Sequence, residues 1–175
     1  MRIGRLQRRS LLATHQGEAA ILFSVAGYVF AISASGVAEI QSLRELKPLP
    51  FARSSTLNSK VKYILERECG TYFVVDAHHH FHLPQAQSTR VLLLRDSRVA
   101  LKVDAIERMT EIETLLPLPA AFQGQERQWY RGLALIGNQV VPAVNTASFL
   151  SRFEQRALER ALSPAKSVER AGVLA

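Results

Sequence analysis

The sequence predicts a mainly β fold of two small packed barrels, followed by one C-terminal helix. Three observations lead to this prediction. About ten short apolar runs of strand length follow one another along the 175 residues. Turn-forming residues separate these runs at short intervals, which is typical of sandwiches and barrels. Apolar residues recur at helical spacing most clearly in a single segment near the C-terminus.

The expected strands are runs rich in Val, Ile, Leu and aromatic residues. The turn dipeptides Asp96-Ser97 and Gly137-Asn138 each lie between two such runs and predict a hairpin. Pro142 lies within the last run and favours an edge or a bulge there. We expect strands at residues 20–26, 28–33, 37–43, 61–66, 71–76, 90–95, 98–104, 106–114, 133–136 and 139–144.

Residues 19–38 contain no charged side chain, and they are just numerous enough to span a bilayer. Arginines precede them, as they would precede a signal anchor. Gly27, however, separates two apolar runs of strand length, and several serines lower the hydropathy. The sequence therefore favours two buried strands and a cytoplasmic protein without membrane insertion.

The helix is expected over residues 146–161, where Thr146 can cap the first turn. Ser163-Pro164 is expected to end it, because proline does not fit the interior of a helix. Residues 44–60 and 115–128 are expected to be linkers. Along the chain we thus expect a basic tail over 1–18, a domain of two barrels over 19–155, and a helix end with a flexible tail over 156–175.

The formal net charge of +7 is concentrated at the two ends of the chain. Residues 1–17 carry +4 and residues 151–175 carry +2, which leaves +1 for residues 18–150. A dedicated nucleic-acid binder usually concentrates positive charge on its folded surface. We therefore expect no nucleic-acid partner, and a small-barrel RNA-binding protein that uses its basic tails remains an alternative.

The motifs of common enzymes are missing, so the sequence predicts a protein without enzymatic activity. It contains no glycine-rich phosphate loop, nucleophile elbow or metalloprotease helix motif. Cys69 is the single cysteine and cannot form an internal disulfide. It could act as a nucleophile only beside a histidine and an orienting group, and a small core residue is the simpler interpretation.

A cluster of histidines follows the expected strand 71–76. In an extended chain, His78, His80 and His82 would point to one side, with Asp76 on the same face. Imidazoles in such an arrangement could bind Zn²⁺ or Ni²⁺, or respond to pH. A metal- or pH-responsive binding module is therefore an alternative function, against a simple polar turn.

Four segments, taken in order, resemble the CheW-like domain family of bacterial chemotaxis adaptors, which also forms the regulatory domain of CheA kinases. GYVFAISASGVAEI is similar to a family strand that ends in V-x-E-I, and TYFVVDAHHHFHLP is similar to I-V-P-V-V-D-L-R-x-x-F-G-L-P. RVALKVDAIERMTEI resembles x-x-G-L-x-V-D-x-V-x-x-V-x-x-I, and WYRGLALIGNQVVPAVNTASFL resembles the closing Y-I-R-G-L-A segment. These segments begin at residues 27, 71, 98 and 129, and the resemblance covers about residues 19–151.

The resemblance implies two SH3-like five-stranded β-barrels packed on one another, with a closing helix. It also implies a non-enzymatic signal-transduction adaptor, without cofactor or catalytic residues, that couples chemoreceptors to a CheA-type histidine kinase. The expected partners are the kinase regulatory domain and the cytoplasmic tip of a chemoreceptor.

The same resemblance and the strand edges that it predicts nominate residues for partner binding. Two positions depart from the family pattern: Glu68 stands at an arginine of the family, and Asn145 replaces the closing aspartate. A reversed charge acts on the choice of partner through electrostatic complementarity. The nominated residues are Val37, Glu39, Ile40, Glu68, Val74, Val75, Arg131 and Gly132.

Overall fold

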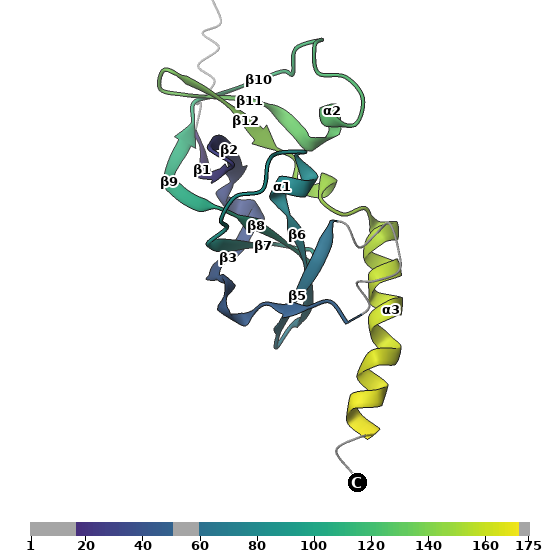
Figure 1. The fold of residues 1–175 in the computed structure, drawn as a ribbon. Coiled ribbons are helices and arrows are strands. Elements are labelled where there is room, and N and C mark those ends of the chain that lie inside the picture. The colour runs from purple at the N-terminus through teal and green to yellow at the C-terminus, as the bar shows by residue number, and fades with distance from the viewer. Residues whose placement is uncertain (1–16, 51–59, 172–175) are drawn as a thin grey trace, which may run out of the picture.

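The computed structural model describes residues 17–50 and 60–171, with side chains up to Ser163. Within these ranges the chain forms two six-stranded sheets that pack on each other, and a long C-terminal helix that runs beside the second sheet (Figure 1). The predicted mainly β class, the packing of two β units and the closing helix are confirmed. Most of the predicted basic tail and part of the predicted linker 44–60 lie outside the described residues.

The first sheet joins the beginning of the described chain to its last strands. Its central contact is a parallel pair between β12 and β2, in which Ala143 is opposite Ala31. In spatial order its strands are β10 (Thr114–Leu116), β11 (Tyr130–Ile136), β12 (Gln139–Val144), β2 (Tyr28–Ser33), β1 (Glu18–Val25) and β9 (Ala105–Ile112).

The second sheet consists of the middle of the chain. It also contains one parallel pair, between β6 and β8. In spatial order its strands are β3 (Val37–Ser42), β7 (Arg90–Leu94), β8 (Val99–Val103), β6 (Gly70–Asp76), β5 (Val61–Arg67) and β4 (Lys47–Pro48). Each described sheet has six strands where five were expected, because β4 and β10 are too short to produce a recognisable pattern.

The long apolar stretch forms the hairpin of β1 and β2, as predicted. Ala26 and Gly27 make its two-residue turn, and both have positive φ, at 51° and 82°. Turns of this kind suit the twist of paired strands. None of the described helices is long and apolar enough to cross a membrane.

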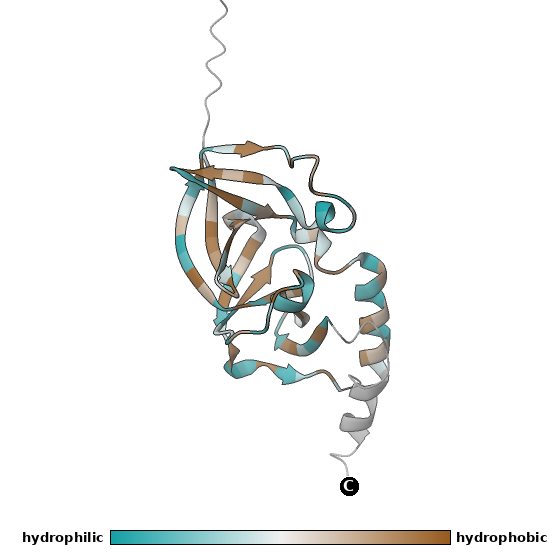
Figure 2. Cartoon of the chain, turned by 45° about the horizontal axis from the view of Figure 1, so that its top comes forward, coloured by the Kyte–Doolittle hydropathy of each residue, from teal (hydrophilic) through white to brown (hydrophobic). Residues whose placement is uncertain are grey.

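Both faces of each sheet are buried, as two packed barrels require. The main core contains side chains of both sheets, such as Phe23 and Phe73, together with Phe149 and Leu158 near the C-terminus. A second cluster lies on the other face of the first sheet, and a third cluster on the other face of the second. The hydrophobic segments therefore follow the strands of both sheets (Figure 2).

Helix α3 (Arg152–Ala171) begins later and ends later than predicted. Ser151 and Glu154 cap it reciprocally, since each side chain accepts a hydrogen bond from the backbone N–H of the other residue. The predicted start at Thr146 is a short 3-10 turn, η4 (Thr146–Ser148), that Asn145 caps. The predicted stop at Ser163-Pro164 is wrong, because a proline removes one hydrogen bond and can bend a helix without ending it.

The histidine segment is not extended, so the three rings do not share a face. Residues Ala77–His80 form a helical turn, α1, which Asp76 caps by accepting a hydrogen bond from the backbone N–H of His78 at 3.0 Å. His78 and His80 are buried, whereas His79 and His82 are exposed. The arrangement therefore does not support the alternative of a metal site at His78, His80 and His82. No group of three or more His, Cys, Asp or Glu side chains in the described chain could hold a metal ion.

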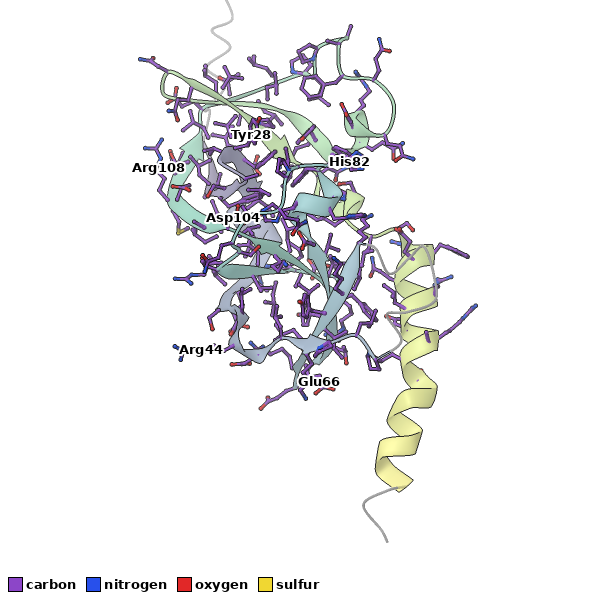
Figure 3. All side chains as sticks on the ribbon, in the orientation of Figure 1. Tyr28, Arg44, Glu66, His82, Asp104 and Arg108 are labelled. Atoms are coloured by element: carbon purple, nitrogen blue, oxygen red, sulfur yellow. The ribbon has the colours of Figure 1, made fainter. Side chains whose placement is uncertain are left out.

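His78 instead links the two sheets. Its Nδ1 lies 3.1 Å from Oδ1 of Asp76, and its Nε2 lies 3.0 Å from Oδ1 of Asp104. Asp104 lies between the sheets (Figure 3) and accepts a 2.6 Å hydrogen bond from the N–H of Ala26 in the β1–β2 turn. Burial alone would raise the pKa of Asp76, but the hydrogen bond and charge of Lys102, with those of His78, hold it below its usual range.

We expect His78→Leu to destabilise the fold by about 3 kcal/mol or more, because it removes the ring that partners two largely buried carboxylates. Urea denaturation measures this loss, and the exposed His79 provides the control. His79→Leu should change the free energy of unfolding by about 0.5 kcal/mol at most. Equal stability of the two variants would contradict the role of His78 as a link.

His80 gives a second prediction, on pH. Burial, with a smaller contribution from the charge of Lys60, lowers its pKa from 6.5 to about 3. The ring therefore stays neutral in the folded state and takes a proton below pH 6.5 only in the unfolded state. The stability that the neutral ring of His80 contributes is fully present above pH 6.5. Below pH 6.5 it falls by up to about 1.4 kcal/mol per pH unit as the pH decreases.

We expect the free energy of unfolding of the wild type to fall more steeply between pH 6.5 and 4.5 than that of His80→Phe. Denaturation at several pH values measures both slopes, and His79→Gln should keep the slope of the wild type. Parallel curves for the wild type and His80→Phe would show that burial does not hold His80 neutral.

Candidate functional site

A groove of about 740 Å³ lies on the second sheet, where the edge strand β3 approaches the β5–β6 hairpin. We call it the hairpin groove. It brings together Glu39 and Glu68, two predicted partner-binding residues from distant parts of the sequence. Its lining residues are Ala38, Glu39, Glu66, Arg67, Glu68, Cys69, Tyr72 and Leu93.

The tight turn of the hairpin exposes Glu68. Arg67 pairs with Gly70, so only Glu68 and Cys69 lie in the turn, and both are exposed. Gly70 has a φ of +129°, a conformation that residues with a side chain rarely adopt. A Cβ there would also lie 3.2 Å from the guanidinium carbon of Arg98. Glu68 makes no ion pair within the described ranges, so its charge is available to a partner.

A bulge in β3 exposes the other wall of the groove. The register with β7 shifts between Val37 and Glu39, which breaks the alternation of buried and exposed side chains. Val37 is buried in the main core, and the next three residues, including Glu39 and Ile40, are all exposed. An apolar side chain, Ile40, thus lies next to an acidic one on the edge strand of the sheet.

Arg67 supplies the positive charge that the sequence analysis missed. Its guanidinium makes an ion pair with Glu45, and its Nε lies 3.7 Å from Oε2 of Glu39. Arg67 directly precedes Glu68. Although Glu68 replaces an arginine of the family pattern, a positive side chain is therefore still present at the neighbouring position. Arg67 gave no signal of its own in the sequence, because Glu39 and Glu45 are more than twenty residues away from it.

Cys69 has an exposed thiol. No histidine is among the residues that shift the pKa of this thiol. Its Sγ lies 3.7 Å from the hydroxyl oxygen of Tyr72. The hydrogen bond to Tyr72, followed by that to Arg98, lowers the pKa of the thiol. The described histidines follow β6 and Cys69 precedes it, a separation of about 20 Å along a seven-residue strand. This arrangement does not support a Cys–His nucleophile.

The three valines nominated for partner binding all lie in the interior. Val74 and Val75 are buried on opposite faces of β6, as adjacent residues of a strand must be. Val37 belongs to the same core cluster as Val75. These side chains support the walls of the groove, and their surfaces are not available to a partner.

Arg131 and Gly132 lie on β11 in the other sheet. Arg131 makes a bidentate ion pair with Glu18 of β1. Hydrogen bonding to Arg131 is the main cause that lowers the pKa of Glu18. Gly132 is buried, and a Cβ there would lie only 2.6 Å from the backbone oxygen of Leu116. The glycine therefore permits the close pairing of β10 with β11. Arg131 is exposed, but it is not part of the hairpin groove.

A second, mainly apolar groove of about 600 Å³ lies on the first sheet. Its residues form no recognisable motif in the sequence, because they come from segments that lie far apart along the chain. Tyr28 and Val140 are its most exposed apolar side chains, at 60% and 56%. We call it the apolar groove. Its lining residues are Tyr28, Val29, Phe30, Phe81, Leu83, Phe122, Tyr130, Gln139, Val140, Val141 and Pro142.

Comparison with known proteins identifies the family. A crystal structure of the scaffolding protein TtCheW from Thermoanaerobacter tengcongensis has the same fold, with a TM-score of 0.64 at 14% sequence identity. The match covers 77% of this chain and 93% of TtCheW. No curated protein sequence matches the chain. The sequence model of the CheW-like domain matches residues 19–154, which include both sheets. The chain therefore belongs to the CheW-like domain family.

Proposed function

We propose that this protein is a non-enzymatic signal-transduction adaptor that couples chemoreceptors to a CheA-type histidine kinase through protein–protein contacts. The observation that carries the proposal is the family match over residues 19–154, which includes both sheets. The proposal places the protein in the cytoplasm, where the kinase regulatory domain and the receptor tip would meet it. It assigns no cofactor and no catalytic residue.

The hairpin groove supports the proposal, because it has the composition of a protein contact. Ile40 is 40% exposed and offers an apolar surface on an edge strand. Ile40 does not line the groove, but its neighbour Glu39 does. Glu39 and Glu68 both line the groove and can select a partner by charge. Charged residues around an apolar centre contribute more to partner choice and to association rate than to affinity.

The apolar groove supports the second half of the proposal. An adaptor must hold two partners at once, so it needs two surfaces that do not overlap. The two grooves share no lining residue and lie on different sheets. We propose that each groove binds one of the two partners.

The first prediction from this proposal is a saturable interaction with the regulatory domain of a CheA-type kinase, or with a receptor tip, of the same organism. We expect a dissociation constant of about 1 μM, which corresponds to roughly −8 kcal/mol. Calorimetric titration of the full chain measures it. An absence of binding to both partners up to about 1 mM, roughly −4 kcal/mol, would refute the adaptor function.

The second prediction concerns the charge of the hairpin groove. Glu68→Arg should weaken binding of one cognate partner about tenfold, a loss of about 1.4 kcal/mol, because complementarity at the contact is reversed. Arg108→Glu is the matched control, since Arg108 is exposed on β9 of the other sheet (Figure 3). If both charge reversals had the same effect, the groove would not be the contact.

The third prediction separates the two grooves. Ile40→Asp, on β3 beside the hairpin groove, should weaken one partner, and Val140→Asp in the apolar groove should weaken the other, because each places a charge on an exposed apolar side chain. Titration of both variants with both domains assigns each groove to its partner. Unchanged affinities in all four titrations would contradict the two-surface arrangement.

A further inference from the structure

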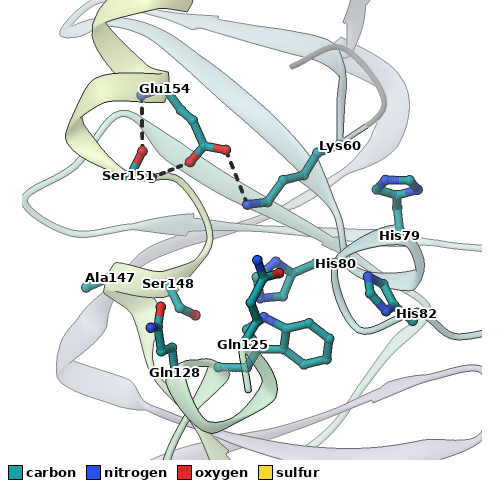
Figure 4. Close-up of a pocket in the computed structure, with 11 residues that line it drawn as sticks. Lys60, His79, His80, His82, Gln125, Gln128, Ala147, Ser148, Ser151 and Glu154 are labelled. Atoms are coloured by element: carbon teal, nitrogen blue, oxygen red, sulfur yellow. Dashed lines mark hydrogen bonds and ion pairs between the residues drawn. The ribbon is translucent and has the colours of Figure 1, made fainter. Parts of the chain in front are cut away.

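A third, polar pocket of about 460 Å³ lies away from both grooves (Figure 4). Its described walls are Lys60 just before β5, α1 with the residues that follow it, α2 (Glu126–Trp129), η4 and the start of α3. It shares no lining residue with either groove. Its lining residues are Lys60, His79, His80, His82, Gln125, Gln128, Trp129, Ala147, Ser148, Ser151 and Glu154.

Lys60 supplies a cation with hydrogen-bonding capacity to spare. Its Nζ lies 3.7 Å from Oε1 of Glu154, which is an ion pair but too long for a good hydrogen bond. An ammonium group has three donors. The other oxygen of Glu154 is already occupied, since it accepts the N–H of Ser151 in the helix cap at 2.7 Å. Among the described residues, the one acid of the pocket therefore leaves the ammonium donors of Lys60 largely unused.

His80 supplies a buried polar atom without a partner. The residue is 4% exposed, and its Nε2 makes no hydrogen bond within the described chain. The ring is fixed between Phe81 and Phe149, with centroid distances of 4.9 Å to each, and it also contacts Trp129. A buried donor or acceptor without a partner is costly, and a ligand that bonds to it removes that cost.

The surroundings of these two groups favour negative charge. The pocket lies at the N-terminus of the twenty-residue helix α3, where the helix dipole is positive. The exposed rings of His79 and His82 also line it, and His82 packs edge-on against Trp129 with centroids 5.1 Å apart. Figure 4 shows Lys60, His79, His80 and His82 around the same space, opposite Ser148 and Ser151.

We propose that this pocket binds a small molecule that carries an oxyanion, a carboxylate or a phosphate group, between Nζ of Lys60 and Nε2–H of His80. The ammonium supplies the charge, and the neutral imidazole supplies a directed donor. The site is independent of the adaptor function, because it contains none of the residues that line the two grooves.

Trp129 gives a direct way to test this site. It is the single tryptophan of the sequence and it lines the pocket, so its fluorescence reports on an occupant. The full chain is titrated with sodium phosphate and, separately, with sodium succinate, at a constant ionic strength of about 0.15 M maintained with NaCl. Calorimetry of the same titrations detects binding that leaves the fluorescence unchanged.

We expect saturation with at least one of the two anions, and the anion that saturates assigns the ligand class. Lys60→Gln should weaken this binding about fivefold or more, whereas Lys47→Gln, which removes the same charge from an exposed lysine elsewhere, should change it less than about twofold. His80→Phe keeps the ring volume and removes Nε2, so it should also weaken binding. The melting temperature of each variant confirms that it is folded.

Two results would overturn the proposal. One is the absence of saturation by either anion in both fluorescence and calorimetry. The other is equal affinity of the wild type, Lys60→Gln and His80→Phe, which would place the bound anion elsewhere on the protein. Titration with kinase and receptor domains is a separate measurement, so failure here leaves the adaptor proposal unaffected.

Discussion

The contact between His78 and two aspartates is the interaction on which the arrangement of this protein depends. Asp76 ends β6 in the second sheet, and Asp104 lies where the chain passes from β8 of that sheet to β9 of the first. The ring of His78 lies between them and is fully buried. Carboxylates removed from water are costly without partners. The sheets can therefore approach in only a few ways, and this contact selects one of them.

Each sheet is also closed on itself by an arginine and a glutamate from strands that are not neighbours. Arg131 of β11 reaches Glu18 of β1 in the first sheet, and Arg67 of β5 reaches Glu39 of β3 in the second. Such pairs require the sheets to curl, which agrees with the buried residues on both faces of each sheet. Because these ion pairs are exposed, their energy is small, and the cores supply most of the stability.

The three cavities follow from this architecture. Curling of the second sheet brings the edge strand β3 to the β5–β6 turn, which forms the hairpin groove. Strand β2, with β12 beside it, lines the apolar groove on the first sheet. The turn α1, which His78 holds in place, directs His80 toward Trp129 and completes the polar pocket. The proposed adaptor function assigns the two grooves to two proteins, and the polar pocket is separate from both.

The sequence by itself determined most of the strands, the hairpins and the family, and the tertiary structure decided where the chemically active side chains point. Strand periodicity and turn residues such as Gly137-Asn138 act over a few positions, so they are legible along the chain. The family resemblance was also legible, because it depends on the order of such local segments. The orientation of the histidines was not, since it depends on a cap by Asp76 and on Asp104, which is 26 residues away from His78. The same holds for the hairpin groove: Glu39 and Glu68 were nominated separately, and only the curling of the sheet places them together around Arg67.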